Sequence, residues 1–414
     1  MTSEVCVIGA GIIGVTTALE LQDRGIDVLL VDKGEPGMQT SFGNAGVLSA
    51  STVLTVNNPG LFRNLPKLLT GSASYFEYDS AYALSESRWL VTFFQRALSR
   101  YSATTARALL GLQRLSIDRH IDLVASAGAT DILSEKGWLK VYRDAGAYNV
   151  SRRERDLMRQ FGVNFQELSS DDVRALEPAL DRTYEYGLLL TESWSVEKPL
   201  DLTRAYLKLF RERGGRHQRM HVVGITDEDG WRIVGEDQSE LQARKVVIAC
   251  GPWAPDICRD LGYRVPMAWE RGYHVHVESP EVQLQRPVLD TRHGFVMAPQ
   301  GQLTRITSGV QFAHRDAPPS YGQMRSAVAA ARECAEFGMQ VDETPWLGAR
   351  PTMPDGLPVI GRANRHDELW FNFGHQHIGM STSTGSAMML ADMLTRQPGN
   401  EQLKVACAPG RFGL

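Results

Sequence analysis

The chain has 414 residues, which at roughly 150 residues per domain leaves room for two or three domains. Hydrophobic residues make up 43% and charged residues 22%, a composition that excludes a disordered or fibrous chain. The 44 Lys and Arg against 48 Asp and Glu leave a net charge of -4 without a basic block, so nucleic acid is not an expected partner.

The N-terminus does not resemble a signal peptide, because Met1-Thr2-Ser3-Glu4 is not basic and the apolar run from Val5 to Ile8 is short. No later stretch offers the roughly 18 apolar residues that span a bilayer. The cysteines form no CxxC pair, so we expect free thiols and neither a disulfide framework nor a zinc site. These features predict a cytoplasmic protein, and peripheral contact with the inner face of the cell membrane stays open.

The first elements along the chain form a dinucleotide-binding pattern. Residues 4–8 predict a buried strand, residues 9–14 read G-x-G-x-x-G, and apolar residues at helical spacing follow as far as Gly25. A second strand, residues 28–31, ends in Asp32, 18 residues beyond Gly14, near the offset at which a carboxylate binds an adenosine ribose. Cβ atoms at Gly9 or Gly11 would hold the backbone away from a pyrophosphate. An ordinary glycine turn is the alternative, but the complete pattern favours a dinucleotide, either NAD or FAD.

Two later segments indicate that this domain is assembled from distant parts of the chain. Residues 244–249 predict a strand that closes in Cys250-Gly251. Residues 369–373 predict another strand, 374–379 a glycine-bounded loop and 380–394 a helix. The N-terminus of that helix could stabilise a charged ring oxygen, or the helix could simply pack on the sheet. A strand, loop and helix at each end of the chain resemble a flavoprotein more than an NAD enzyme.

Several motifs together resemble the D-amino-acid oxidase and glycine oxidase superfamily, most closely its bacterial D-amino-acid dehydrogenase branch, which includes D-hydroxyproline dehydrogenase-like proteins. Besides the N-terminal pattern, the resemblance rests on Thr40-Ser41-Phe42-Gly43-Asn44-Ala45-Gly46, Arg88-Trp89-Leu90, Arg271-Gly272-Tyr273, Gly348-Ala349-Arg350-Pro351, Asp355-Gly356-Leu357-Pro358-Val359-Ile360-Gly361 and Gly374-His375. These motifs are spread over most of the chain.

The resemblance implies an α/β protein with a discontinuous Rossmann-like FAD-binding domain, residues 1–56, 195–262 and 345–414. An inserted α+β substrate domain, residues 57–194 and 263–344, would be built on a mixed sheet that includes strands 138–142 and 273–277. A predicted helix over residues 83–98 carries an apolar stripe, which we interpret as core packing, with membrane or partner docking as the alternative.

The resemblance also implies noncovalent FAD, with the pyrimidine end of its ring on the backbone of residues 376–380, where a helix N-terminus favours negative charge. No cysteine near Arg350 could bind the flavin covalently. The implied cofactor-binding residues are Gly9, Gly11, Ile12, Ile13, Gly14, Asp32, Lys33, Ser41, Asn44, Ala45, Gly46, Val222, Cys250, Gly251, Gly348, Gln376, His377, Ile378, Gly379 and Met380.

Three residues are candidates for the substrate site. A guanidinium holds a carboxylate bidentately, so Arg350 is the first candidate, with a surface ion pair as the alternative. Tyr273 could hydrogen-bond the same carboxylate or cover the site, or it could pack in a core. His377 lies where some relatives carry a second polar substrate contact. We interpret the pairs His274/His276 and His375/His377 as structural, with no metal expected. Gln311, where relatives often have Glu, is given no role.

The activity implied by the resemblance is an FAD-dependent dehydrogenase that oxidises D-amino acids, including cyclic ones such as D-proline or hydroxy-D-proline, to imino acids. A hydride would pass from the substrate Cα to flavin N5, and electrons would then pass to a quinone or another acceptor. A glycine- or sarcosine-type amine oxidase that produces hydrogen peroxide shares every motif. A flavin-binding subunit without its own substrate and an NAD-dependent dehydrogenase are the further alternatives, and partner subunits stay open.

Overall fold

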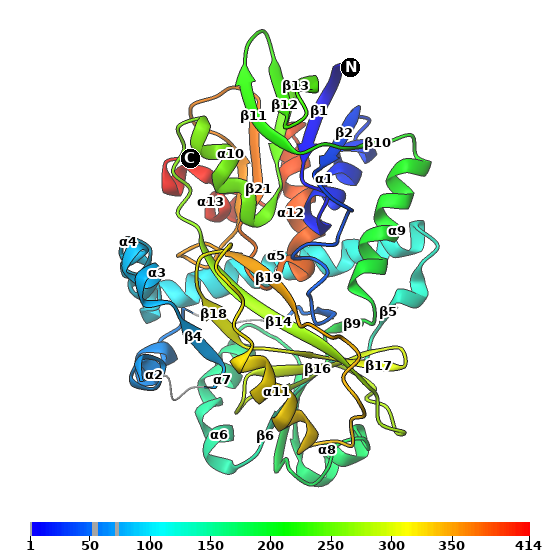
Figure 1. Cartoon of the computed structure of the whole chain (residues 1–414), viewed down its shortest axis with the longest axis vertical. Helices are drawn as coiled ribbons and strands as arrows, with labels where there is room; N and C mark the ends of the chain where they lie inside the picture. Colours follow the sequence, from blue (N-terminus) through cyan, green and yellow to red (C-terminus); the bar gives the residue numbers. More distant parts are fainter. Residues whose placement is uncertain (1, 52–56, 71–73) are drawn as a thin grey trace.

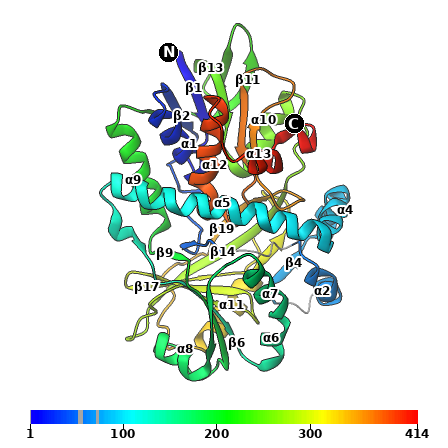
Figure 2. The same ribbon diagram turned by 180° about the vertical axis from the view of Figure 1, so that it is seen from behind.

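The computed structural model describes residues 2–51, 57–70 and 74–414 of the chain. Two large sheets lie one above the other in the view of Figure 1, with helices packed around each. Both sheets contain parallel and antiparallel pairs, which confirms the predicted α/β class. The long helix α5 (Ser99–Ser126) crosses between the two halves and lies in front of them in Figure 2.

The upper sheet has eight strands among the described residues, and its centre is parallel. The parallel strands run in the order β10, β2, β1, β13 and β21, while β12 and β11 form an antiparallel extension and β20 pairs with β21. Their bounds are β1 (Thr2–Ile8), β2 (Val28–Asp32), β10 (Arg216–Arg219), β11 (Val222–Asp227), β12 (Trp231–Gly235), β13 (Glu240–Ile248), β20 (Val359–Arg362) and β21 (Leu369–Phe373). The four strands predicted from residues 4–8, 28–31, 244–249 and 369–373 are therefore β1, β2, β13 and β21.

The lower sheet has ten strands in the described part of the chain, with β14 near one end and β6 near the other. Its order is β4, β18, β14, β17, β16, β15, β6, β8 and β7, and β19 also pairs with β14. The bounds are β4 (Phe76–Tyr78), β6 (Trp138–Tyr142), β7 (Phe165–Ser169), β8 (Tyr186–Leu190), β14 (Ala268–Glu278), β15 (Val288–Asp290), β16 (Phe295–Gln300), β17 (Leu303–Thr307), β18 (Val310–Phe312) and β19 (Trp346–Thr352). A small third sheet joins β3 (Val47–Leu48), β9 (Trp194–Val196) and β5 (Leu133–Ser134).

The helices pack on the outside of both sheets (Figures 1 and 2). Besides α5, they are α1 (Ile12–Asp23), α2 (Gly60–Leu69), α3 (Ser80–Ser85), α4 (Ser87–Arg96), α6 (Ala145–Val150), α7 (Arg152–Gln160), α8 (Ser170–Leu176), α9 (Pro199–Glu212), α10 (Ala254–Asp260), α11 (Gly322–Arg332), α12 (Gly379–Leu394) and α13 (Glu401–Cys407). The predicted helix over residues 83–98 is two helices, α3 and α4. Ser85 Oγ donates to the carbonyl of Tyr82 at the end of α3, a local bond that competes with helix continuation.

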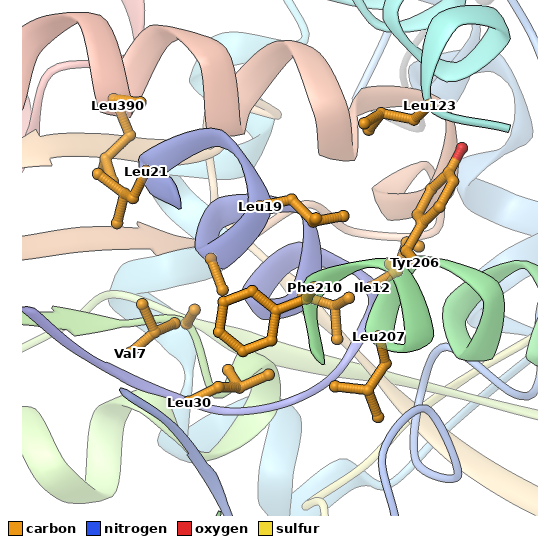
Figure 3. Close-up of a cluster of buried hydrophobic side chains, with 14 of the residues drawn as sticks. Val7, Ile12, Leu19, Leu21, Leu30, Leu123, Tyr206, Leu207, Phe210 and Leu390 are labelled. Atoms are coloured by element: carbon orange, nitrogen blue, oxygen red, sulfur yellow. The ribbon is translucent and has the colours of Figure 1, made fainter. Parts of the chain in front are cut away.

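The largest core holds α1 between β1, α9 and α12, as Figure 3 shows. Leu19 of α1, Phe210 of α9 and Leu390 of α12 are fully buried in it. Burial of apolar surface contributes about 25 cal/mol per Å², so this cluster stabilises the glycine loop at the start of α1 through the helix that follows it. The apolar stripe of α4 is partly a core as well, since Trp89 and Phe93 are buried against Phe312.

The structure differs from the predicted domain boundaries at two elements. Strand β19, which the prediction placed with the FAD-binding segments, pairs with β14 in the lower sheet over seven residue pairs. Helix α5, which the prediction placed in the substrate domain, packs along α12 and contributes Leu112 and Leu123 to the core around α1. The domain limits stay a prediction, and these two elements connect the halves.

Candidate active site

A cavity lies where the carboxyl ends of β1, β2, β13 and β21 meet β14 and β19. Ligands of open parallel sheets bind at this edge, outside the carboxyl ends of the strands. The start of α1, the loop after β2 and the start of α12 complete the lining. The cavity therefore extends from the glycine loop to the lower sheet.

The glycine loop is shaped by backbone contacts that leave no room for side chains. Gly9 has φ +111°, and a Cβ there would lie 2.7 Å from the carbonyl oxygen of Ala249. A Cβ on Gly14 would lie 1.7 Å from the Gly9 oxygen, so Gly14 lets α1 pack directly on the loop. Asp32 accepts hydrogen bonds from the backbone N–H groups of Ala10 (2.6 Å) and Gly34 (2.9 Å), which fixes its carboxylate at the cavity.

The loop before α12 forms a second part of the cavity lining. Gln376 has the left-handed φ of +51°, and its backbone N–H donates to the Pro351 carbonyl at 3.0 Å. Gly379 and Met380 bring the free N–H groups of the 16-residue helix α12 to the lining. The Nε2 atom of Gln376 and the Oδ1 atom of Asn372 are buried without a partner among the described residues, and both side chains line the cavity. Bare glycines in one part of the lining and orphaned polar atoms beside a helix N-terminus in another fit a dinucleotide.

Most of the candidate residues line this one cavity. They are Gly9, Gly11, Ile12, Ile13, Asp32, Lys33, Ser41, Asn44, Val222, Cys250, Gly251, Tyr273, Gly348, Arg350, Gln376, His377, Gly379 and Met380. Four candidates do not line it, namely Gly14, Ala45, Gly46 and Ile378. Gly14 acts through packing, and a Cβ on Gly46 would lie 2.0 Å from the Val196 oxygen, so this glycine is needed where the chain passes β9.

Arg350 extends across β14 at the lower end of the cavity. Gly272 leaves the space for it, since a Cβ there would lie 2.2 Å from Arg350 Nη2. Arg350 Nη1 donates to the Gly309 carbonyl at 3.1 Å, and no salt bridge to Arg350 is present among the described residues. Burial lowers the pKa of Arg350, while the negative charge of Glu270, its cross-strand neighbour, opposes the shift. A guanidinium in this position can bind a carboxylate inside the cavity.

Tyr273 directs its side chain to the other face of β14. Side chains alternate along a strand, so Glu270 and Gly272 share the face of Arg350, whereas Tyr273 lies in the core beneath. Its hydroxyl donates to Gln311 Oε1 at 2.6 Å and accepts from the Ser320 backbone N–H at 2.9 Å. Burial raises the pKa of this phenol. The geometry favours the packing alternative over a substrate contact, and it gives Gln311 the structural partner that the sequence did not reveal.

The histidine pairs have different surroundings. His377 lines the cavity, where desolvation by the surrounding protein first and the charge of Arg350 second lower its pKa to about 4, so the imidazole is neutral near pH 7. His375 is buried with Nε2 3.1 Å from Ser386 Oγ, and burial lowers its pKa to about 3. His276 pairs with Asp342, its Nδ1 3.0 Å from the carboxylate. No cluster of three His, Cys, Asp or Glu side chains suited to a metal occurs in residues 2–51, 57–70 and 74–414.

Trp346 is a cavity residue that the sequence analysis missed. Its indole lies over two glycines, because a Cβ would approach it to 1.9 Å on Gly43 and to 2.1 Å on Gly348. It stacks on His274 with ring centres 4.8 Å apart. Trp346 precedes Arg350 by four residues in β19, so strand alternation places both on one face. That spacing was a usable signal once residues 346–352 were recognised as one strand.

Comparison with known proteins agrees with this arrangement. A family model described as FAD dependent oxidoreductase (DAO) matches residues 4–393. The chain therefore belongs to this family of FAD-dependent oxidoreductases.

Curated relatives match along nearly the whole chain. A D-amino-acid oxidase of Bradyrhizobium diazoefficiens is 27% identical, with 95% of this chain and 96% of the relative covered. A D-amino acid dehydrogenase 2 of Ralstonia nicotianae is 28% identical, with 95% and 97% covered. Glycine oxidase from Geobacillus kaustophilus superposes with a TM-score of 0.76 at 22% identity, covering 96% of both chains. L-proline dehydrogenase from P. horikoshii superposes with a TM-score of 0.72 at 17% identity, and the match covers 99% of this chain and 98% of the dehydrogenase chain. These two structures share the fold.

The side chains at the cavity can bind and orient a substrate without reacting themselves. FAD, when bound, supplies a two-electron oxidation of a C–H bond, so the protein needs no nucleophile. Arg350 can fix a carboxylate; Gly272 leaves room for its guanidinium, and Gly348 leaves room for the indole of Trp346, which lines the cavity. Among described residues no helix has the length and apolar character needed to cross a membrane.

Proposed function

We propose that this protein oxidises D-amino acids to imino acids and passes the electrons to a quinone or another carrier. The observation that carries the proposal is the Arg350 guanidinium, which lies inside the cavity without a salt bridge among the described residues and with bare glycines beside it. An arginine held in this way matches an α-carboxylate. The names of the relatives, D-amino-acid oxidase and D-amino acid dehydrogenase, support the substrate class.

We assign FAD a noncovalent place along the cavity. The glycine loop and Asp32 would hold the adenosine and pyrophosphate, and the backbone of residues 376–380 would hold the pyrimidine end of the ring, with His377 beside the substrate. Cys250 is the cysteine at the lining, and burial raises the pKa of its thiol to about 12, so it is a poor nucleophile for covalent attachment.

Cyclic D-amino acids, such as D-proline and hydroxy-D-proline, are the substrates that we place first. The flat indole of Trp346 lines the cavity on the same face of β19 as Arg350 and offers a surface on which a saturated ring can pack. The aromatic wall would contribute to binding by burying apolar surface rather than by hydrogen bonding.

We further propose a cytoplasmic location with peripheral contact to the membrane or to partner subunits. Five free cysteines suit a reducing compartment. Exposed apolar side chains lie along α3, along α4 and after the end of α4. They are Leu84, Val91 and Leu98, which are 77%, 57% and 43% exposed. Such a surface would bring the protein close to a membrane-dissolved quinone.

The proposal is tested by anaerobic absorbance of the purified yellow protein. D-Proline, hydroxy-D-proline, other D-amino acids, their L-enantiomers, glycine and sarcosine are added one at a time, and air is then admitted. Bleaching by D-amino acids with slow recolouring in air, accelerated by a quinone analogue, is the expected result. Bleaching only by L-enantiomers, or by no amino acid, would contradict the proposal, and the second outcome favours a flavin-binding subunit.

An oxidase is the second candidate, because the relative from Bradyrhizobium is named D-amino-acid oxidase. The same experiment separates the two. Rapid recolouring in air with one equivalent of hydrogen peroxide per turnover identifies an oxidase, and catalase combined with an oxygen electrode measures it.

A further inference from the structure

Arg305 of β17 is a buried cation that has no salt bridge within the described part of the chain. It is 2% exposed, and burial lowers its pKa to about 10. Its Nη1 donates to the carbonyls of Phe42 and Asn44 at 2.7 Å each, and its guanidinium carbon lies 5.0 Å from the centre of the Phe42 ring. Burying a charge without a salt bridge is costly, so these contacts give the guanidinium its compensation.

The two carbonyls belong to residues 40–46, which we call the cavity loop, and whose Ser41, Gly43 and Asn44 line the cavity. The start of the loop is fixed by Ser41, which accepts from the Ile12 N–H at 3.0 Å. Its end is fixed by the Val196 N–H, which donates to the Gly46 carbonyl at 2.7 Å. Arg305 thus holds the middle of the loop by two hydrogen bonds from the lower sheet, and the Phe42 ring also packs against His274 and Trp346.

Arg305 is itself held by a histidine in a defined tautomer. Its Nε donates to His276 Nε2 at 3.2 Å, so Nε2 carries no proton. The proton is on Nδ1, which donates to the Asp342 carboxylate at 3.0 Å. Burial first and Arg305 second lower the pKa of His276, and Asp342 opposes them. His274, with its ring centre 5.1 Å away, has a pKa lowered to about 2 and stays neutral.

We propose that Arg305 is a positioning residue for the cofactor, which holds the cavity loop in its FAD-binding conformation while the neutral imidazole of His276, hydrogen-bonded to Asp342, holds Arg305. The inference rests on the proposed place of FAD in this cavity. Protonation of His276 Nε2 would remove the acceptor of Arg305 and place a second cation against it. The neutral histidine therefore favours FAD binding, and affinity falls as the pH falls below the ordinary range of a histidine.

The first test compares FAD dissociation constants of holoproteins, measured by ultrafiltration and by the fluorescence of released flavin. Arg305→Lys keeps the charge, but one ammonium cannot reach both carbonyls and His276. We expect FAD to bind about tenfold more weakly, a loss of about 1.4 kcal/mol. The matched control is Arg286→Lys. Arg286 is a guanidinium that contacts Glu177 and the Lys136 carbonyl, and it does not line the cavity. Its dissociation constant should stay within about twofold of the wild type.

The second test separates positioning from a general loss of stability through its pH profile. His276→Gln offers Oε1 as an acceptor to Arg305 and cannot gain a proton. Between about pH 7.5 and pH 5, the dissociation constant of the wild type should rise about fivefold more than that of the variant. His221 and His377 also line the cavity in both proteins, so the difference between the two profiles carries the test.

Each outcome decides a different point. Arg305→Lys with wild-type affinity, or affinity lost equally in Arg286→Lys, would overturn the inference while leaving the proposed function intact. Parallel pH profiles of the FAD dissociation constant in the wild type and His276→Gln would also overturn it. Should Arg305→Lys fail to fold, this comparison of pH profiles tests the inference by itself. A wild-type protein that binds no FAD would instead refute the proposed place of the cofactor.

Discussion

Replacing Arg350 by methionine removes the proposed carboxylate contact and keeps a side chain of similar length. The proposed FAD cradle lies on the glycine loop and at the start of α12, so the variant should retain its flavin. The loss should appear in substrate binding and orientation. Arg350→Lys is the conservative variant, because it retains a positive charge without the fork of a guanidinium.

The size of the effect follows from the bonds removed. A bidentate guanidinium–carboxylate pair consists of two charge-assisted hydrogen bonds of about 1.5–3 kcal/mol each. At 1.36 kcal/mol per factor of ten, Arg350→Met should lower kcat/KM by about 10²–10⁴. The kcat/KM of Arg350→Lys should lie between those of Arg350→Met and the wild type. Single-turnover bleaching under anaerobic conditions measures substrate affinity and the rate of flavin reduction separately.

Glu270 provides an internal control for damage to the fold. Its carboxyl is 3% exposed and its Oε2 lacks a partner among the described residues. Burial raises the pKa of Glu270, and Arg350 opposes that shift, so Arg350→Met leaves a buried acid without its nearby cation. The variant should lose about 1–3 kcal/mol of stability. The double variant Arg350→Met with Glu270→Gln should regain most of the lost free energy of unfolding. It should regain none of the lost kcat/KM. A kcat/KM within about threefold of the wild type in Arg350→Met would refute the carboxylate role.

Three further predictions concern the cradle, Tyr273 and a buried histidine. Gly11→Leu should purify without most of its FAD, because the leucine side chain would enter the cavity. The control Gly224→Ala, whose Cβ would lie in open space, should keep the wild-type ratio of flavin to protein absorbance. Tyr273→Phe should keep kcat/KM within about threefold and lose about 1 kcal/mol of stability in urea, because its hydroxyl bonds lie on the face of β14 away from Arg350; a loss of catalysis comparable to that of Arg350→Met would reinstate Tyr273 as a substrate contact. Burial lowers the pKa of His120 to about 4, so the unfolded chain binds the proton at a higher pH than the folded protein does. The free energy of unfolding should therefore fall as the pH drops from about 6.5 to 4, by up to about 1.4 kcal/mol per pH unit. Urea titrations of His120→Gln should show a smaller loss of stability in acid than those of the wild type.

The nucleotide-binding half was predictable because its signals are local. The glycine spacing in residues 9–14 and the acid at Asp32 lie within one strand–helix–strand unit. The contacts show why position 14 is glycine, since its missing Cβ lets α1 pack on the Gly9 carbonyl. The FAD-dependent family also followed from the motifs at both ends of the chain.

The substrate side was harder to predict because it depends on strand register. Arg350 lies opposite Glu270, and Gly348 lies opposite Gly272, which places Tyr273 on the other face. A shift of one residue in this pairing would have exchanged the two faces. Sequence alone gives no register between strands about 80 residues apart, so Tyr273 and Trp346 could not be sorted into core and cavity.

Both arginines at this cavity were hard to interpret for a related reason. Arg350 and Arg305 lie near the cavity with lowered pKa values and without a salt bridge among the described residues, a condition that costs free energy in the folded protein. They differ in how that cost is offset. Arg305 uses three acceptors that the chain itself provides, so its charge is committed to the cavity loop. Arg350 has one carbonyl and an acid that it does not touch, so most of its donors are left for a ligand. This difference in remaining hydrogen-bonding capacity, and not the charge itself, is why we propose Arg350 as the substrate residue and Arg305 as the support of the cavity loop.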